Sequence, residues 1–166
     1  MVLRALFEGA RESVVLAGYS FDHAKDVLSP LHCAMHDHGV IARFFVDVPQ
    51  LPRGQRADTH LAASLSAFVA SSWPFGHPMP HIYYDKRALQ PGPPWCSLHA
   101  KCVVVDGIKT FVSSANFTQR GQERNIEVGV LIEDANFAGY LAGQWLGLIE
   151  AGIVGEYIAG DEPTGP

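Results

Sequence analysis

The chain has 166 residues, of which 48% are hydrophobic, and this length and composition fit one globular domain with a sizeable core. They exclude an intrinsically disordered protein, and no apolar run approaches the roughly 18 residues that are needed to span a bilayer. The net charge of −5 argues against a large basic surface for nucleic acid, but it leaves room for a local basic patch.

The cysteines and the first residues indicate the compartment. Cys33, Cys96 and Cys102 are too few for a disulfide framework, and an odd number is typical of a reducing environment. The first ten residues lack the long apolar core of a signal peptide and already carry Glu8. We therefore expect a cytoplasmic protein with no membrane partner.

The first half of the chain predicts three successive helix–strand units. Gly39 is expected to end the second helix, and Asp58 is expected to cap the third, after a loop with two prolines. The units are a helix over 2–12 with a strand over 13–20, a helix over 28–38 with a strand over 41–48, and a helix over 59–71 with a strand over 81–85.

The second half predicts antiparallel strands and a closing helix. Asp106-Gly107 is a strong signal for a tight turn between two strands, and Asp134 is expected to cap the last helix. The elements are a proline-rich surface loop over 86–98, strands over 103–106, 110–113 and 126–133, and a helix from Asp134 to about Glu150 that Gly152 ends.

This order of elements predicts an α/β fold, in which a mixed, mostly parallel β-sheet is flanked by helices on both faces. We expect a single domain over 1–160 with a flexible tail over 161–166. No internal repeat and no second domain is visible in the sequence.

Three pairs of polar residues with i, i+2 spacing fall at the ends of strands that are expected to be neighbours. Because side chains alternate faces along a strand, both members of a pair point the same way. Burying such groups without a purpose costs several kcal/mol, so we expect them to converge in one cleft that binds a phosphate. The pairs are His99 with Lys101, Ser114 with Asn116, and Asn125 with Glu127.

Each of these residue types suits a step of chemistry at phosphorus. The imidazole of His99 is a competent nucleophile, and Lys101 places positive charge where negative charge builds up in the transition state. Ser114 and Asn116 add neutral donors, and Glu127 is expected to hold the other imidazole nitrogen of His99. Asp106 lies on the opposite face from Lys101, beside the turn, so we expect a structural role for it.

Further residues near these pairs are candidates for binding the substrate. Arg120 and Arg124 flank the predicted cleft and suit contacts with backbone phosphates. Trp95, in the loop before the first pair, suits contact with a base, although aromatic residues at such places are more often part of a core or an interface. Asn125 completes the predicted substrate-binding set.

Two other motifs have plainer explanations. His23-Ala-Lys25 repeats part of the site's local sequence, but Pro30 stands where an aspartate would be needed, so we expect a surface loop. His32, Cys33 and His36 lie close together on a predicted helix, and a structural zinc ion is the alternative to an amphipathic helix with polar histidines. No second His/Cys pair with zinc-site spacing follows, which favours the plain helix.

His99-Ala-Lys101, with Asp106 five residues after the lysine and Ser114-Ala-Asn116 beyond, resembles the HKD signature of the phospholipase D superfamily. The similarity extends over roughly residues 10–150 and is greatest to the small nuclease branch, whose members carry a single motif. One departure is visible, because Ser113 stands where the family usually has a glycine before the serine.

This resemblance implies a two-step phosphodiester reaction that uses no metal ion or other cofactor and passes through a phosphohistidine on His99. Family members use two histidines from two motifs, whereas this chain has one. The resemblance therefore implies a homodimer that shares one active site on its two-fold axis. It implies DNA or RNA as the substrate, and by analogy it suggests a role beside other proteins of an anti-phage defence complex.

Two alternatives stay open at this point. The same fold could serve as a non-catalytic module that binds nucleic acid or a partner protein, which the acidic net charge and Ser113 both allow. A phospholipid or another small phosphodiester is the other substrate class, although no strongly basic amphipathic helix is visible. The sequence decides neither the type of nucleic acid nor whether cleavage depends on base sequence.

Overall fold

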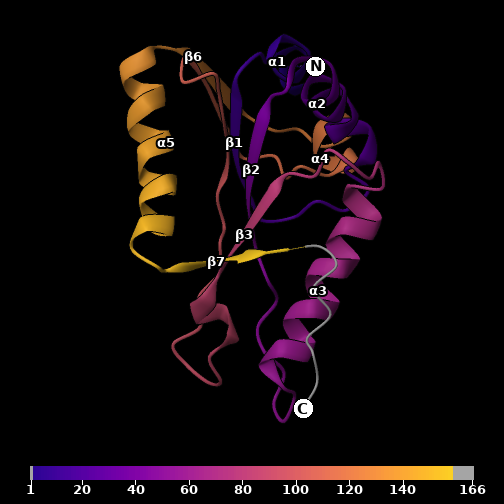
Figure 1. The fold of residues 1–166 in the computed structure, drawn as a ribbon, viewed down its shortest axis with the longest axis vertical. Coiled ribbons are helices and arrows are strands. Elements are labelled where there is room, and N and C mark those ends of the chain that lie inside the picture. Colours follow the sequence, from indigo (N-terminus) through magenta and orange to yellow (C-terminus); the bar gives the residue numbers. More distant parts are fainter. Residues whose placement is uncertain (1, 159–166) are drawn as a thin grey trace.

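A mixed sheet of seven strands runs through the middle of the protein, with helices on both of its faces (Figure 1). The structure is a computed structural model, and it describes residues 2–158. The strands stand in the order β6-β5-β4-β1-β2-β3-β7. Their bounds are Ser13–Gly18 for β1, Ile41–Val46 for β2, His81–Asp85 for β3, Lys101–Val105 for β4, Lys109–Ser113 for β5, Gly129–Glu133 for β6 and Val154–Tyr157 for β7.

The helices are divided unequally between the two faces of the sheet. Figure 1 shows α5 alone on the left of the sheet, with α1, α2, α3 and the short α4 on the right. Of the helices within residues 2–158, none combines the length and the apolar character needed to cross a membrane. Their bounds are Val2–Gly9 for α1, Lys25–His38 for α2, Ala57–Ser72 for α3, Gln119–Glu123 for α4 and Ala135–Glu150 for α5, and a 3₁₀ helix, η1, covers Lys86–Leu89.

The mixed sheet agrees with the prediction, but its balance of strand directions does not. β1, β2 and β3 are parallel neighbours, whereas β4, β5 and β6 form an antiparallel meander beside β1, and β7 pairs antiparallel with β3. Parallel pairing therefore accounts for two of the six strand pairs in the described chain, and the predicted mostly parallel sheet is wrong. For β4 and β5 the cause is local, because the tight turn at Asp106-Gly107 returns the chain antiparallel, whereas the other antiparallel pairs are joined by longer segments.

Both faces of the central strands are buried. Val14 and Leu16 of β1 belong to the core under α1, α2 and α3, while Val15 and Ala17 belong to the core under α5. A strand covered on both faces has no solvent-exposed side, so residues 13–18 contain apolar residues without alternation. This strand can therefore support a site at its end without itself being accessible to solvent.

Several local predictions are confirmed. Gly39 follows α2 in the left-handed region, with φ of 70°, and its N–H bonds to Met35 O at 3.1 Å. The carboxylate of Asp134 accepts a hydrogen bond from Phe137 N at 2.8 Å and caps α5. The predicted turn between β4 and β5 places Asp106 and Gly107 at φ of 52° and 62°.

Other boundaries differ from the prediction. Asp58 does not cap α3, because the helix begins at Ala57 and the Asp58 carboxylate lies in its first turn, bound to Arg56 at 2.6 Å. That position still suits a negative charge, since the helix dipole is positive there. The strand predicted over 126–133 begins only at Gly129, and α4 and β7 were not predicted at all. The predicted tail over 161–166 lies outside the described residues.

The topology brings strand ends to one edge of the sheet. The parallel strands β1, β2 and β3 all end there. Since β4 is antiparallel to β1 and β5 is antiparallel to β4, β4 begins at this edge and β5 ends there, and β6 begins beside the end of β5. The three predicted polar pairs lie at the start of β4, after the end of β5 and before the start of β6. All three pairs therefore lie at the same edge of the sheet.

Candidate active site

His99 and Lys101 lie at the beginning of β4, and their side chains meet. The Lys101 Nζ atom is 3.4 Å from His99 Nδ1 and donates a hydrogen bond to His99 O at 3.2 Å. Tyr19, which directly follows β1, contacts both residues. Its ring centroid lies 4.5 Å from that of the His99 imidazole, and Lys101 Nζ lies 5.3 Å from the same ring. The aromatic ring therefore supports the imidazole and attracts the ammonium group at once.

Asp47, at the end of β2, fastens the segment that leads into His99. Its carboxylate accepts hydrogen bonds from Leu98 N at 2.7 Å and from the Ser97 hydroxyl at 3.1 Å. Burial raises the pKa of the Asp47 carboxyl, while the two hydrogen bonds oppose that increase. A half-buried acid is retained here because it fixes the backbone beside the proposed nucleophile. The sequence analysis missed Asp47 and Tyr19, each of which follows a strand as a single polar residue.

Ser114, Asn125 and Glu127 form a second cluster, between the end of β5 and the beginning of β6. The Ser114 hydroxyl donates to Glu127 Oε2 at 2.5 Å and accepts from Val128 N at 3.1 Å, and Asn125 Nδ2 donates to Glu127 Oε1 at 3.0 Å. The bond from Ser114 lowers the pKa of Glu127 most, followed by that from Asn125, and the charge of Lys101 lowers it further. Glu127 is therefore kept as a carboxylate.

The predicted bond from Glu127 to His99 is not present within residues 2–158. Both carboxylate oxygens of Glu127 already accept hydrogen bonds from other donors, and its segment precedes β6 instead of belonging to the strand. The prediction assumed a longer strand that would aim Glu127 across the sheet. Within one chain, Glu127 instead orients Ser114.

The link between Ser114 and Glu127 leads to a pH prediction. In Ser114→Ala, the largest cause of the lowered pKa of Glu127 is removed, so we expect this pKa to rise toward its ordinary value. Carboxyl NMR titration of Glu127 should then show its midpoint at higher pH than in the wild type, while the matched variant Ser97→Ala leaves it in place. An unchanged midpoint in Ser114→Ala would contradict the assignment. Because the pKa of Glu127 is lower in the folded than in the unfolded protein, its carboxylate stabilises the fold at pH values above the unfolded-state pKa. This stabilisation is lost as the pH falls through the folded-state pKa, and we expect it to be smaller in Ser114→Ala.

Ser113 replaces the glycine of the resembled motif without obstructing the cluster. Its hydroxyl donates to Val128 O at 3.2 Å and accepts from Ala115 N at 3.0 Å. Opposite it on β6 stands Gly129, where a Cβ atom would lie 3.2 Å from the Ser113 hydroxyl oxygen and only 2.7 Å from Phe111. The missing side chain at Gly129 leaves the space that the Ser113 side chain needs.

Asn116 lines a pocket of about 500 Å³ together with Asn125 of the second cluster. The amide oxygen of Asn116 is buried and has no hydrogen-bond partner in the described chain. Arg120, Arg124 and Asn125 line the same pocket, so three of the four predicted substrate-binding residues lie together. Trp95 does not join them, because it is 54% exposed in the loop before His99 and lines neither this pocket nor the one beside His99.

His99 also borders a second pocket, of about 290 Å³, between its loop and α5. Ser97, Trp145 and Arg87 line this pocket, and the indole nitrogen of Trp145 is buried there without a hydrogen-bond partner among residues 2–158. Arg87 is engaged by Asp85 at 2.7 Å, so it is less available for a phosphate than the arginines beside Asn116. The imidazole therefore borders a pocket that Trp145, Leu148 and Ile153 give an apolar wall.

Asp106, the last member of the motif, lies at the far end of β4 from His99. Its carboxylate accepts hydrogen bonds from three consecutive backbone N–H groups, those of Arg11, Glu12 and Ser13, at 2.8–3.2 Å. It thereby ties the turn after β4 to the beginning of β1. This contact supports the pairing of the two strands that hold Tyr19 and Lys101.

Loss of the Asp106 carboxylate should destabilise the fold. Asp106→Ala leaves three backbone donors without their charged acceptor and places alanine at positive φ, so we expect the free energy of unfolding to fall by about 2–4 kcal/mol. Urea denaturation measures this change, with the exposed Glu150→Ala as a control that should stay within about 0.5 kcal/mol of the wild type. A similarly small effect for Asp106→Ala would refute the anchoring role.

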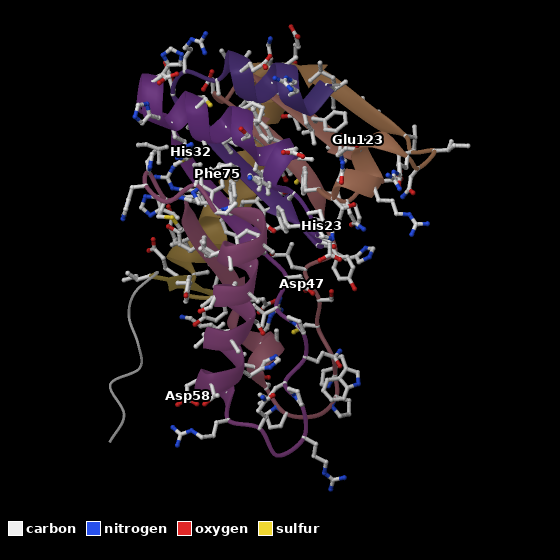
Figure 2. The ribbon with its side chains drawn as sticks, turned by 90° about the vertical axis from the view of Figure 1, so that its right-hand side faces the viewer. His23, His32, Asp47, Asp58, Phe75 and Glu123 are labelled. Carbon is white, nitrogen blue, oxygen red and sulfur yellow. The ribbon has the colours of Figure 1, made fainter. Side chains whose placement is uncertain are left out.

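His32 and His36 of α2, which the sequence offered as zinc ligands, contact other residues of the protein instead. His32 Nε2 lies 3.2 Å from His77 O, and its ring stacks on Phe75 at 4.9 Å, as the two labels in Figure 2 indicate. His36 binds its neighbour Asp37 at 2.8 Å. Across residues 2–158, no three His, Cys, Asp or Glu side chains gather closely enough to hold a metal ion.

A mixed sheet with a His-x-Lys pair, a Ser-x-Asn pair and a glutamate at one edge is the arrangement that the resembled motif predicts. Residues 3–145 match the family described as "Cardiolipin synthase, PLD-like domain". The chain therefore belongs to the PLD-like domains of the phospholipase D superfamily.

Individual relatives resemble the chain at lower identity. The DISARM protein DrmC of Bacillus paralicheniformis is 28% identical over 131 residues, which cover 79% of this chain and 48% of the relative, so the chain spans about half of that protein. NucT from Helicobacter pylori superposes with a TM-score of 0.69 at 19% identity, covering 94% of this chain and 89% of NucT. Nuc from Salmonella typhimurium, a phospholipase D family member, superposes with a TM-score of 0.63 at 20% identity, covering 95% of this chain and 90% of Nuc. At these identities the two structures establish the fold.

Proposed function

We propose that the protein is a metal-independent phosphodiesterase that hydrolyses DNA or RNA through a phosphohistidine on His99. The observation that carries this proposal is the contact of His99 with Lys101 at the sheet edge where Ser114, Asn116 and Glu127 also lie. The names of the superposed proteins NucT and Nuc fit a nuclease, and their chains are covered almost completely.

Each residue has a defined task in the proposed reaction. An imidazole nitrogen of His99 forms a bond to phosphorus while the bond to the leaving oxygen breaks, and that oxygen takes a proton from His99 of the partner subunit. The now neutral histidine then removes a proton from water, whose oxygen displaces His99 from phosphorus. Lys101 stabilises the charge on the non-bridging oxygens, and Ser114 and Asn116 orient the phosphate.

The second histidine is proposed to come from a second copy of the chain. Each chain carries the motif once, and a two-fold interface places a residue opposite itself. The segment that holds Glu127 also carries exposed apolar side chains, since Ile126 is 104% exposed, Val128 73% and Val130 56%. Val130 lies opposite Val112 on β5, which is 41% exposed, so these residues form a continuous apolar surface beside the half-site.

A second copy that covered this apolar surface would bring Glu127 of one subunit toward the site of the other. The predicted bond to an imidazole nitrogen would then form between subunits, and the two His99 residues would titrate as a pair. The similarity to DrmC further supports work within a defence complex that contains other proteins.

The test is cleavage of single- and double-stranded DNA and RNA in the presence of EDTA. We expect turnover of at least one of these substrates, and no turnover of phospholipid vesicles. If an intact dimer cuts none of them, the nuclease proposal fails. Binding of nucleic acid that is equal in the wild type and in His99→Ala, without turnover, would instead indicate a non-catalytic module.

A further inference from the structure

The pocket beside Asn116 is lined by several polar residues that the proposed reaction, which uses Asn116, does not involve. All the residues that line its volume of about 500 Å³ have polar or charged side chains. One wall is formed by residues 116–125, and the other by Ser20, Asp22 and His23, in the turn between β1 and α2. Figure 2 shows His23 on the same side of the molecule as Glu123 of α4.

The first wall offers unpaired positive charge. Neither Arg120 nor Arg124 makes a side-chain hydrogen bond or an ion pair with any residue of the described chain. In contrast, Arg4, Arg56 and Arg87 are each held by a carboxylate. A guanidinium group that faces a pocket without a partner can bind a phosphate in a forked geometry. These two arginines therefore favour a phosphate at their side of the pocket.

The opposite wall does not suit a phosphate. Asp22 would repel it, while the side chains of Ser20 and His23 offer hydrogen-bond donors and acceptors. His23 has φ of 53°, a left-handed conformation that is unfavourable for a residue with a side chain, and the turn is closed by Ala24 N bonding to Phe21 O at 2.9 Å. This turn thus fixes the backbone from which the His23 side chain joins the pocket lining.

The volume of the pocket also argues against a phosphate alone. A water molecule occupies about 30 Å³, and a phosphate only a few times that, whereas pockets of about 300–1,000 Å³ bind small organic molecules. A nucleotide matches the chemistry of both walls, because its phosphate can bind the two arginines while its base forms hydrogen bonds with Asp22 and His23. Asn116 belongs to this pocket and to the proposed phosphate site, so the nucleotide would be next to the one that is cut.

We propose that this pocket binds the nucleotide that flanks the scissile phosphate of a single-stranded substrate and recognises its base by hydrogen bonds. This inference rests on the proposed function and names its substrate class. A base can enter a concave pocket only after it leaves a duplex stack, so single strands are preferred. Because no Phe, Tyr or Trp side chain lines the pocket, and His23 is its one ring, hydrogen bonds to the base edge make most of the contact, and base identity therefore matters.

The carboxylate of Asp22 makes the expected preference specific. An ionised carboxylate only accepts hydrogen bonds, so it suits a base with an exocyclic amino group. Adenine, cytosine and guanine carry such a group, and thymine and uracil do not. We expect thymine or uracil to be disfavoured at one position beside the cut.

The experiment is to cleave random single-stranded oligonucleotides and to sequence the ends. The wild type should disfavour thymine or uracil at one flanking position, and this bias should fall about tenfold in Asp22→Asn and in His23→Ala. Arg53→Ala, an exposed arginine outside the pocket, should keep the bias. Uniform base usage beside the cut, or a bias that survives both pocket variants, would overturn the proposal.

A binding measurement separates this proposal from the proposed function. Fluorescence anisotropy of His99→Ala with short single strands of one base each needs no turnover. We expect homopolymers of adenine or cytosine to bind about tenfold more tightly than those of thymine, and a duplex to bind more weakly than its single strand, with Asp22→Asn reducing the difference between bases. Equal affinity for all bases overturns the pocket assignment, even if the wild type cleaves nucleic acid.

Discussion

His99→Ala should reduce the rate of phosphodiester cleavage by at least about 10⁴-fold, because removing a nucleophile eliminates the covalent path and leaves only binding and charge stabilisation. In a shared site the loss is compounded, since the same substitution also removes the proton donor contributed by the partner subunit. Lys101 and Tyr19 contact the imidazole, so they are the groups whose attack on phosphorus would appear as residual cleavage in the variant.

Initial rates in EDTA measure this effect for purified wild type and variant. His38→Ala is the matched control, because His38 is an exposed histidine in the last turn of α2, on another part of the surface. It should retain the wild-type rate. A His99→Ala protein that keeps more than about a hundredth of the rate would show that another group attacks phosphorus.

The double substitution Ile126→Lys with Val128→Lys should separate the proposed dimer, and cleavage should be lost at the same time. Both side chains are strongly exposed, and on a two-fold axis each new ammonium group would approach its own copy and repel it. The folded monomer should keep its Ser114–Glu127 hydrogen bond, but it would present only half of the catalytic groups. Cleavage per subunit should therefore fall to the level of His99→Ala.

Sedimentation or light scattering gives the solution mass, and cleavage is measured on the same samples. Ile108→Lys is the matched control, because Ile108 is 51% exposed in the turn after β4, at the opposite end of that strand from His99. It should remain dimeric and active. A wild type that is monomeric at all concentrations and still cleaves would refute the shared site.

The placement of the site at one sheet edge followed from the sequence because the polar residues came in pairs. His99 with Lys101, and Ser114 with Asn116, show the two-residue period of a strand, and this period does not depend on knowing which strands are neighbours. The place of Glu127, whose predicted bond to His99 is not present in the described chain, could not be predicted in the same way. It required the position at which β6 begins, and strand boundaries are set by pairing with β5 and not by the local sequence alone.

The residues that were missed have no periodic signal. Tyr19 and Asp47 act through the spatial order of the strands, because β1 lies between β4 and β2. His23 was expected in a surface loop, and it does lie in a loop between β1 and α2, but only the fold places that loop beside Arg120. A single polar residue directly after a buried parallel strand is the signal that could have identified Tyr19 and Asp47.

The pairing of β1 with β4 has a consequence for synthesis of the protein. Gly18 at the end of β1 lies opposite Lys101 at the start of β4, although the two residues are far apart along the chain. β1, β2 and β3 are all synthesised before β4 emerges from the ribosome. Closing such a long loop is slow compared with forming local contacts. A partly synthesised chain can therefore pair β1 with β2 and β3, but it still lacks the strand that carries Lys101, so the residues of the candidate site come together only after β4 and β5 have left the ribosome.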